Sequence, residues 1–216
     1  MNKSLSATLG RFVRPRLLST GFGNCDLCAT GLPAQHRHLL EISNRKILCA
    51  CKACALRFEN VIGKFKLIPR GARPLPDFQM TDAQWKNLAL PINLAFILQD
   101  SVTEKLTAIY PGPAGARESL LTFENWGVIV ADNPELSNLR PDVEALLINR
   151  VGSARDYAIA PIDVCFELVG LIRKHWRGFS GGKIVWREIE TSFSRFREWR
   201  PADRLGGLPA VPEVPQ

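Results

Sequence analysis

Two C-x-x-C pairs, separated by 22 residues, constrain what this chain can fold into more than any other feature. Cys25 and Cys28 form the first pair, and Cys51 and Cys54 form the second. A two-residue gap lets one tight turn direct two thiolates at the same point, and four thiolates complete the tetrahedral shell of a structural zinc site. The spacing therefore predicts a zinc-ribbon-like module in which these four cysteines bind zinc.

The segment between the two pairs has the pattern of a β-hairpin. Residues 36–42, "HRHLLEI", and 45–50, "RKILCA", are strand-like, and Ser43 and Asn44 stand where a turn is needed. The separation slightly exceeds the roughly 15–20 residues of the common ribbon spacing, and a longer hairpin absorbs the difference.

Three further side chains in this segment could reach a metal. Cys49 could replace Cys51 as a ligand, but the C-x-x-C spacing favours Cys51, so we expect Cys49 to pack beside the site. His36 and His38 alternate with Arg37 and therefore share one face of the strand, close to the metal. Because four thiolates already satisfy zinc, we expect both histidines to be polar neighbours rather than ligands.

An iron or iron–sulfur electron carrier would use the same cysteines. Four thiolates also bind a single iron, and five nearby cysteines could hold an iron–sulfur cluster. Rubredoxin-like sites carry a glycine just after each cysteine pair, where Ala29 and Ala55 stand here. This difference favours zinc over iron.

A metal-dependent nuclease is the enzymatic alternative. Two C-x-x-C pairs that frame His36, His38 and Asn44 are similar to the arrangement of HNH nucleases, in which a histidine activates water beside a catalytic cation. No further histidine follows until His175, so a third ligand is missing from the expected stretch. The sequence therefore favours a non-enzymatic role.

Composition indicates a soluble protein of a reducing compartment. The 216 residues are 46% hydrophobic, and no apolar run approaches the roughly 20 residues of a membrane span. Six cysteines, four of them in C-x-x-C pairs, without a secretory signal, suit a metal better than disulfides, so we expect a cytoplasmic protein. The net charge of +7 would allow a nucleic-acid partner without favouring one.

The chain divides into five segments by composition. We expect a flexible basic arm over 1–20, a cysteine-rich module over 21–68, a Pro-rich link over 69–78, an α+β body over 79–200, and a disordered Pro-rich tail over 201–216.

Helix and strand patterns alternate within the body. Thr81 with Gln84 forms a capping-box pattern that opens a short helix ended by Pro91, and Asn133 with Pro134 stops a second helix. Residues 111–120 read as a turn leading into a helix. The class we expect is α+β, with a two-layer body. Its strands are mostly antiparallel, at 93–99, 105–111, 143–151 and 156–162, and its two C-terminal amphipathic helices lie within 161–178 and 181–200. The apolar stripe of the first helix is Cys165, Leu168, Val169, Ile172 and Trp176, and that of the second is Val185, Ile189, Phe193 and Phe196.

Several segments resemble one uncharacterised bacterial family. They are the cysteine window together with "YPGPAGARESLL", "PDVEALLINR" and "APIDVCFELVGLIRKHWRGFSGG", and the likeness extends over roughly residues 10–197. The family resembled is encoded beside nickel–iron hydrogenases, especially the high-affinity, actinobacterial-type enzymes. The resemblance implies a cytoplasmic accessory protein for hydrogenase assembly or electron transfer, and the positions that carry over are Cys25, Cys28, Cys49, Cys51 and Cys54, with His36 and His38.

These observations together predict a non-enzymatic metal-binding accessory protein. It would assist the assembly, maturation or function of a nickel–iron hydrogenase through contacts with a hydrogenase subunit or maturation factor. The alternatives are an iron or iron–sulfur electron-transfer protein of the same system, and an HNH-like nuclease or a nucleic-acid-binding zinc-ribbon protein.

Overall fold

The computed structural model describes residues 23–59, 61, 63–112, 115–176 and 182–198. The predicted basic arm at 1–20 and the predicted tail at 201–216 lie outside these residues.

A three-stranded antiparallel sheet follows the first cysteine pair. Strands β1 (Arg37–Glu41) and β2 (Lys46–Ala50) form the predicted hairpin, and β3 (Phe65–Leu67) pairs with the other edge of β1. The short helix α2 (Lys52–Phe58) directly follows β2 and packs on this sheet. The sequence did not predict α2 or β3. The module has a small apolar cluster of its own, made of Leu39, Leu48, Ala50, Ala55 and Phe65.

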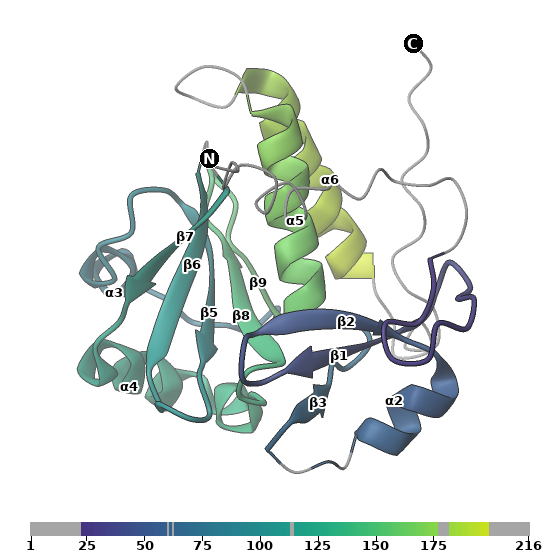
Figure 1. Ribbon diagram of the computed structural model, residues 1–216. Helices are drawn as coiled ribbons and strands as arrows, with labels where there is room; N and C mark the ends of the chain where they lie inside the picture. The colour runs from purple at the N-terminus through teal and green to yellow at the C-terminus, as the bar shows by residue number, and fades with distance from the viewer. Residues whose placement is uncertain (1–22, 60, 62, 113–114, 177–181, 199–216) are drawn as a thin grey trace, which may run out of the picture.

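A six-stranded antiparallel sheet forms the centre of the body (Figure 1). Its spatial order is β4-β9-β8-β5-β6-β7. The four predicted strands are confirmed, and with the helices they establish the α+β class. The strands are β4 (Arg73–Pro74), β5 (Leu94–Gln99), β6 (Leu106–Gly112), β7 (Gly115–Leu120), β8 (Glu144–Asn149) and β9 (Asp156–Pro161).

The two edge strands of this sheet correct the sequence analysis. Residues 115–120 form β7 rather than the start of a helix, and the whole of β7 pairs with residues 107–112 of β6. Most of their side chains are exposed, so the strand carries no apolar alternation, while Gly115 supplies the left-handed φ of 116° at its start. At the opposite edge, β4 lies within the predicted link, and an edge strand tolerates Pro74 because one side of it needs no ladder hydrogen bonds.

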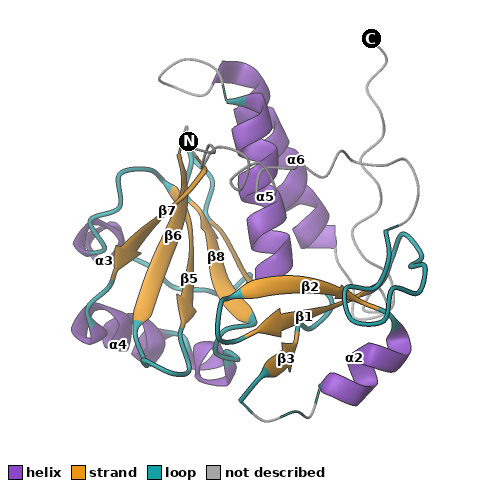
Figure 2. Cartoon of the chain, in the orientation of Figure 1, coloured by secondary structure: helices purple, strands orange, loops and turns teal. Residues whose placement is uncertain are grey.

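Helices cover both faces of the large sheet (Figure 2). The two predicted C-terminal helices, α5 (Ile162–His175) and α6 (Gly182–Glu198), pack on one face. Shorter helices cover the other face, so the body has a layer in addition to the predicted sheet and its two C-terminal helices. The shorter helices are α3 (Asp82–Asn87), α4 (Phe123–Asp132) and the 3₁₀ helix η1 (Pro134–Asn138).

Alternating side chains of the strands divide the core into two clusters. Phe96 and Leu147 face α5 and α6, whereas Ile97 and Leu146 face the shorter helices. The predicted apolar stripes of α5 and α6 are buried in the first cluster, through Cys165, Leu168, Val169 and Ile172 and through Val185, Ile189 and Phe193. The side chain of Phe196, which was predicted to continue the second stripe, lies outside the described residues.

The small module is attached to the body by packing and by ion pairs. Its residues Leu40 and Ile68 are buried in the same cluster as α5 and α6. Two ion pairs reach across from the module to the body, Lys66 to Asp142 at 2.5 Å and Arg45 to Asp100. His38 Nδ1 also donates a hydrogen bond to the Asp163 carboxylate at 2.6 Å.

Two helix ends are stabilised as the sequence predicted. The Thr81–Gln84 capping box is present at the start of α3. Asn133 caps α4, and its buried amide donates to the backbone carbonyls of Gln79 and Ile129, at 2.8 Å each, while its oxygen accepts from the Gln79 N–H at 2.7 Å. Such a fully bonded amide fixes the chain before α3 against the end of α4.

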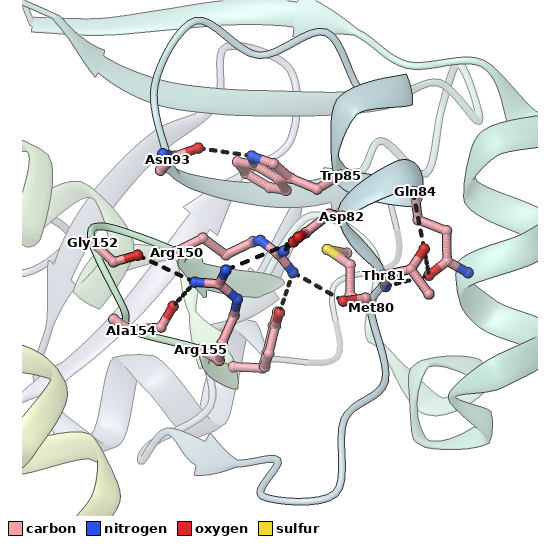
Figure 3. Close-up of polar contacts among 11 residues, drawn as sticks. Met80, Thr81, Asp82, Gln84, Trp85, Asn93, Arg150, Gly152, Ala154 and Arg155 are labelled. Atoms are coloured by element: carbon pink, nitrogen blue, oxygen red, sulfur yellow. Dashed lines mark hydrogen bonds and ion pairs between the residues drawn. The ribbon is translucent and has the colours of Figure 1, made fainter.

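A buried arginine joins α3 to β8 and β9 (Figure 3). The Arg150 side chain is only 3% exposed. It forms an ion pair with Asp82, donates to the Met80 carbonyl at 3.0 Å and to the Tyr157 hydroxyl at 2.8 Å, and lies 5.8 Å from the ring centre of Trp85. The sequence analysis did not single out this residue.

Candidate metal centre

The first cysteine pair lies in a tight turn before β1. The Cys25 N–H donates to the Thr30 carbonyl and the Ala29 N–H donates to the Cys25 carbonyl, both at 2.8 Å. Ala29 has a φ of 61°, which is the left-handed conformation that favours glycine. The turn at Cys25 and Cys28 therefore has the shape of a glycine-containing metal-binding turn, although alanine occupies the position.

The second cysteine pair lies at the start of α2. Cys51 is the N-cap residue, and its sulfur accepts a hydrogen bond from the Cys54 N–H at 3.4 Å. The N–H of Cys51 in turn donates to the Cys25 sulfur at 3.3 Å. The first cysteine pair thus lies in a tight turn, and the second pair lies in the first turn of α2. The N–H groups at the start of a helix favour negative charge on a nearby sulfur.

These elements bring the four predicted sulfur atoms together. All four lie within 4.8 Å of one another, and those of Cys28 and Cys51 are 3.7 Å apart. A tetrahedral zinc ion with bonds of about 2.3 Å would hold its sulfur ligands about 3.8 Å apart. None of these cysteines is in a disulfide. The four residues form a candidate metal site with the donor set that closed structural zinc sites use.

The electrostatics of the four thiols are uneven. A hydrogen bond with the Thr30 side chain, assisted by the Thr30 backbone, lowers the pKa of Cys28 to about 6. Desolvation and hydrogen bonds with the neighbouring thiols raise the pKa of Cys54 to about 12. Cys28 therefore ionises easily, whereas Cys54 keeps its proton beside the other thiols. A bound cation would be needed for all four thiols to ionise together.

The remaining cysteine of the body has a different environment. Cys165 lies in α5, is fully buried in the core, and has its pKa raised by that burial. It is a packing residue of the kind that buried cysteines commonly are.

His36, His38 and Cys49 form a second group of metal-ligating side chains. The ligand atoms of these three residues also lie within 4.8 Å of one another. The sequence analysis placed the two histidines on one face of the strand, and it expected them and Cys49 to be neighbours of the four-cysteine site, without grouping the three as ligands. The predicted turn at 43–44 could have indicated this group, because a two-residue turn there places His38 opposite Cys49 in the hairpin, as the structure does.

Comparison with known proteins gives a family and no function. Across the described part of the chain, no helix combines the length and hydrophobicity of a membrane span. No curated protein and no solved structure has significant similarity to this sequence. One family model, described as a family of unknown function (DUF5947), matches residues 24–200, which contain both cysteine pairs and nearly all of the body. The chain therefore belongs to the DUF5947 family.

Proposed function

We propose that this chain is a non-enzymatic accessory protein in which Cys25, Cys28, Cys51 and Cys54 bind a structural zinc ion. The observation that carries the proposal is the convergence of these four sulfur atoms within 4.8 Å. Four protein ligands leave no position for a substrate, so a metal bound here stabilises the fold rather than taking part in a reaction.

The module needs this stabilisation because its own core is small. Its apolar cluster has five buried residues, and α2 is only seven residues long. Isolated helices of this length are marginal in water, and small cores commonly depend on a metal. Zinc would connect the first turn, the hairpin and α2, so its binding free energy would become folding free energy of the module.

The partner we propose is a subunit or maturation factor of a nickel–iron hydrogenase in the cytoplasm. The support for this part of the proposal is the sequence resemblance described above. The structure adds a folded body, whose sheet is covered by helices on both faces.

Metal analysis of the chain purified without oxygen tests the zinc site. We expect at least one zinc per chain and no visible absorption. Cys28→Ser should remove one zinc equivalent and expose the module to proteolysis, whereas the control Cys165→Ala should keep the zinc, since Cys165 is a core residue of α5. Stoichiometric iron with visible charge-transfer bands would instead support the electron-transfer alternative.

Coexpression with hydrogenase subunits and maturation factors tests the partner. Coelution with one of them during size-exclusion chromatography is expected, and separate elution from all of them would contradict the proposal. Cleavage of plasmid DNA with added magnesium or manganese would support the nuclease alternative. Salt-dependent retention on DNA would support nucleic-acid binding.

A further inference from the structure

The second group of ligands lies on the β1–β2 hairpin, outside the four-cysteine cluster. Cys49 stands directly opposite His38 in the strand register, and His36 precedes His38 by two residues. Directly opposite residues of an antiparallel pair have their Cβ atoms about 4.5–5.5 Å apart, and residues two apart share a face of the sheet. The hairpin itself therefore places three metal-ligating side chains together.

Hydrogen bonds fix which nitrogen of each histidine faces the group. His36 Nδ1 lies 3.0 Å from the Pro33 carbonyl oxygen, and His38 Nδ1 lies 2.6 Å from a carboxylate oxygen of Asp163. Both oxygens are acceptors, so both Nδ1 atoms carry the proton. In the neutral rings, each Nε2 is then a lone-pair donor available to a cation.

The two Nε2 atoms approach each other in a way that calls for a cation. They lie 3.2 Å apart, and the two ring planes are inclined by 84°. Two lone pairs at this separation repel each other, so either a proton or a metal ion must lie between the two nitrogens. Two imidazoles on one tetrahedral zinc ion, with bonds of about 2.0–2.1 Å, would hold their nitrogens about 3.3 Å apart.

We propose that His36, His38 and Cys49 form a second metal site, which binds a divalent transition metal of the zinc and cobalt type. Two imidazoles and one thiolate suit such ions and do not suit magnesium or calcium. Three protein ligands leave a fourth position for water or another small ligand, as in catalytic zinc sites. All three residues are partly exposed, so the ion can enter from solvent.

Asp163 is a positioning residue of this site. It comes from α5 of the body, 125 residues away from His38 in the sequence. A carboxylate on the far nitrogen of a metal-bound histidine holds the ring and increases its basicity. The site thus connects the hairpin to the body, and it goes beyond the structural zinc site proposed above.

Cobalt binding by the full chain tests the second site. Protein produced with zinc is dialysed against a weak chelator until one zinc per chain remains, and cobalt(II) alone is then added. We expect uptake of one further equivalent, with the visible bands of tetrahedral cobalt and a thiolate charge-transfer band. His36→Ala and Cys49→Ser should each abolish this uptake and keep the first zinc, whereas His175→Ala, outside the group, should retain it.

Each outcome of the titration decides the proposal. No second equivalent in the wild-type chain, or an unchanged second equivalent in Cys49→Ser, would overturn it. Loss of the first zinc in the wild-type chain would instead count against the four-cysteine site, so the two failures are distinguishable. Asp163→Asn should weaken cobalt binding at the second site by about 10–100-fold and leave the first zinc in place. An unchanged cobalt affinity would remove Asp163 from the site.

Discussion

Truncation of the buried Arg150 is the sharpest test of how the body is held together. Arg150→Ala removes a side chain that is 3% exposed, and Arg155→Ala removes one that is 48% exposed. Both arginines approach the same carboxylate, that of Asp82 (Figure 3). The two variants therefore compare the stability cost of losing a buried partner of Asp82 with the cost of losing an exposed one.

The contacts of the two arginines predict very different costs. Loss of Arg150 leaves the buried Tyr157 hydroxyl and the part-buried Met80 carbonyl without their donor, and an unsatisfied buried group costs about 1–3 kcal/mol. A cavity adds to this, while Asp82 regains water because it is 73% exposed. We expect a loss of about 3 kcal/mol for Arg150→Ala. For Arg155→Ala we expect about 0–1 kcal/mol, the usual value for exposed pairs.

Urea unfolding of the zinc-loaded proteins, followed by circular dichroism, measures both costs. With a slope of about 2 kcal/mol per molar, the midpoint of Arg150→Ala should fall by about 1.5 M, and that of Arg155→Ala by less than about 0.5 M. The slopes should stay equal, because the surface exposed on unfolding is nearly the same. Equal costs for the two variants would refute the reasoning.

Three further predictions concern other contacts. Arg45 and two backbone N–H groups hold the pKa of Asp100 below its usual range. The ionised Asp100 side chain therefore stabilises the folded state fully above about pH 4, and this stabilisation declines as the pH falls further. The stability difference between wild type and Asp100→Asn, measured in urea, should narrow over that range. Asn133→Ala should cost about 2 kcal/mol or more in the same assay, because buried backbone groups lose their partners. Leu39→Ala, at a fully buried position, should cost about 3 kcal/mol, against less than about 0.5 kcal/mol for Leu120→Ala, which is 68% exposed; equal midpoints would contradict this.

Local signals in the sequence were sufficient for most of the fold. The capping box at Thr81, the stop at Asn133 and the apolar runs of β5, β6, β8 and β9 are all determined by neighbouring residues. The sequence did not predict β7 and β4, because an edge strand pairs with one neighbour and needs no apolar alternation. β7 has mainly exposed side chains, and β4 has only two residues, one of them Pro74.

Spacing located the candidate metal centre but could not supply its long-range contacts. Two short gaps were enough to indicate the four cysteines, since each pair is arranged by its own turn. The contact between His38 and Asp163 joins positions 125 residues apart, and no local pattern encodes it. The sequence also did not indicate that Arg150 is buried, because its partners Tyr157 and Asp82 come from two other elements.

Backbone and side-chain hydrogen bonds connect the two groups of ligands, so a metal bound by the four cysteines would also support the second group. The Cys49 N–H donates to an Asp26 carboxylate oxygen at 2.7 Å, and the Asp26 N–H donates to the Cys49 carbonyl at 2.9 Å. Asp26 lies inside the first C-x-x-C pair, so a metal that orders this turn also fixes the backbone of Cys49. Asp163, which lies in α5, accepts a hydrogen bond from His38 of the second group. If metals bind at both proposed sites, the metal in the four-cysteine site would order the backbone of Cys49, and the body would hold His38 through Asp163. The open position of the second site would then depend on the fold of both parts of the chain.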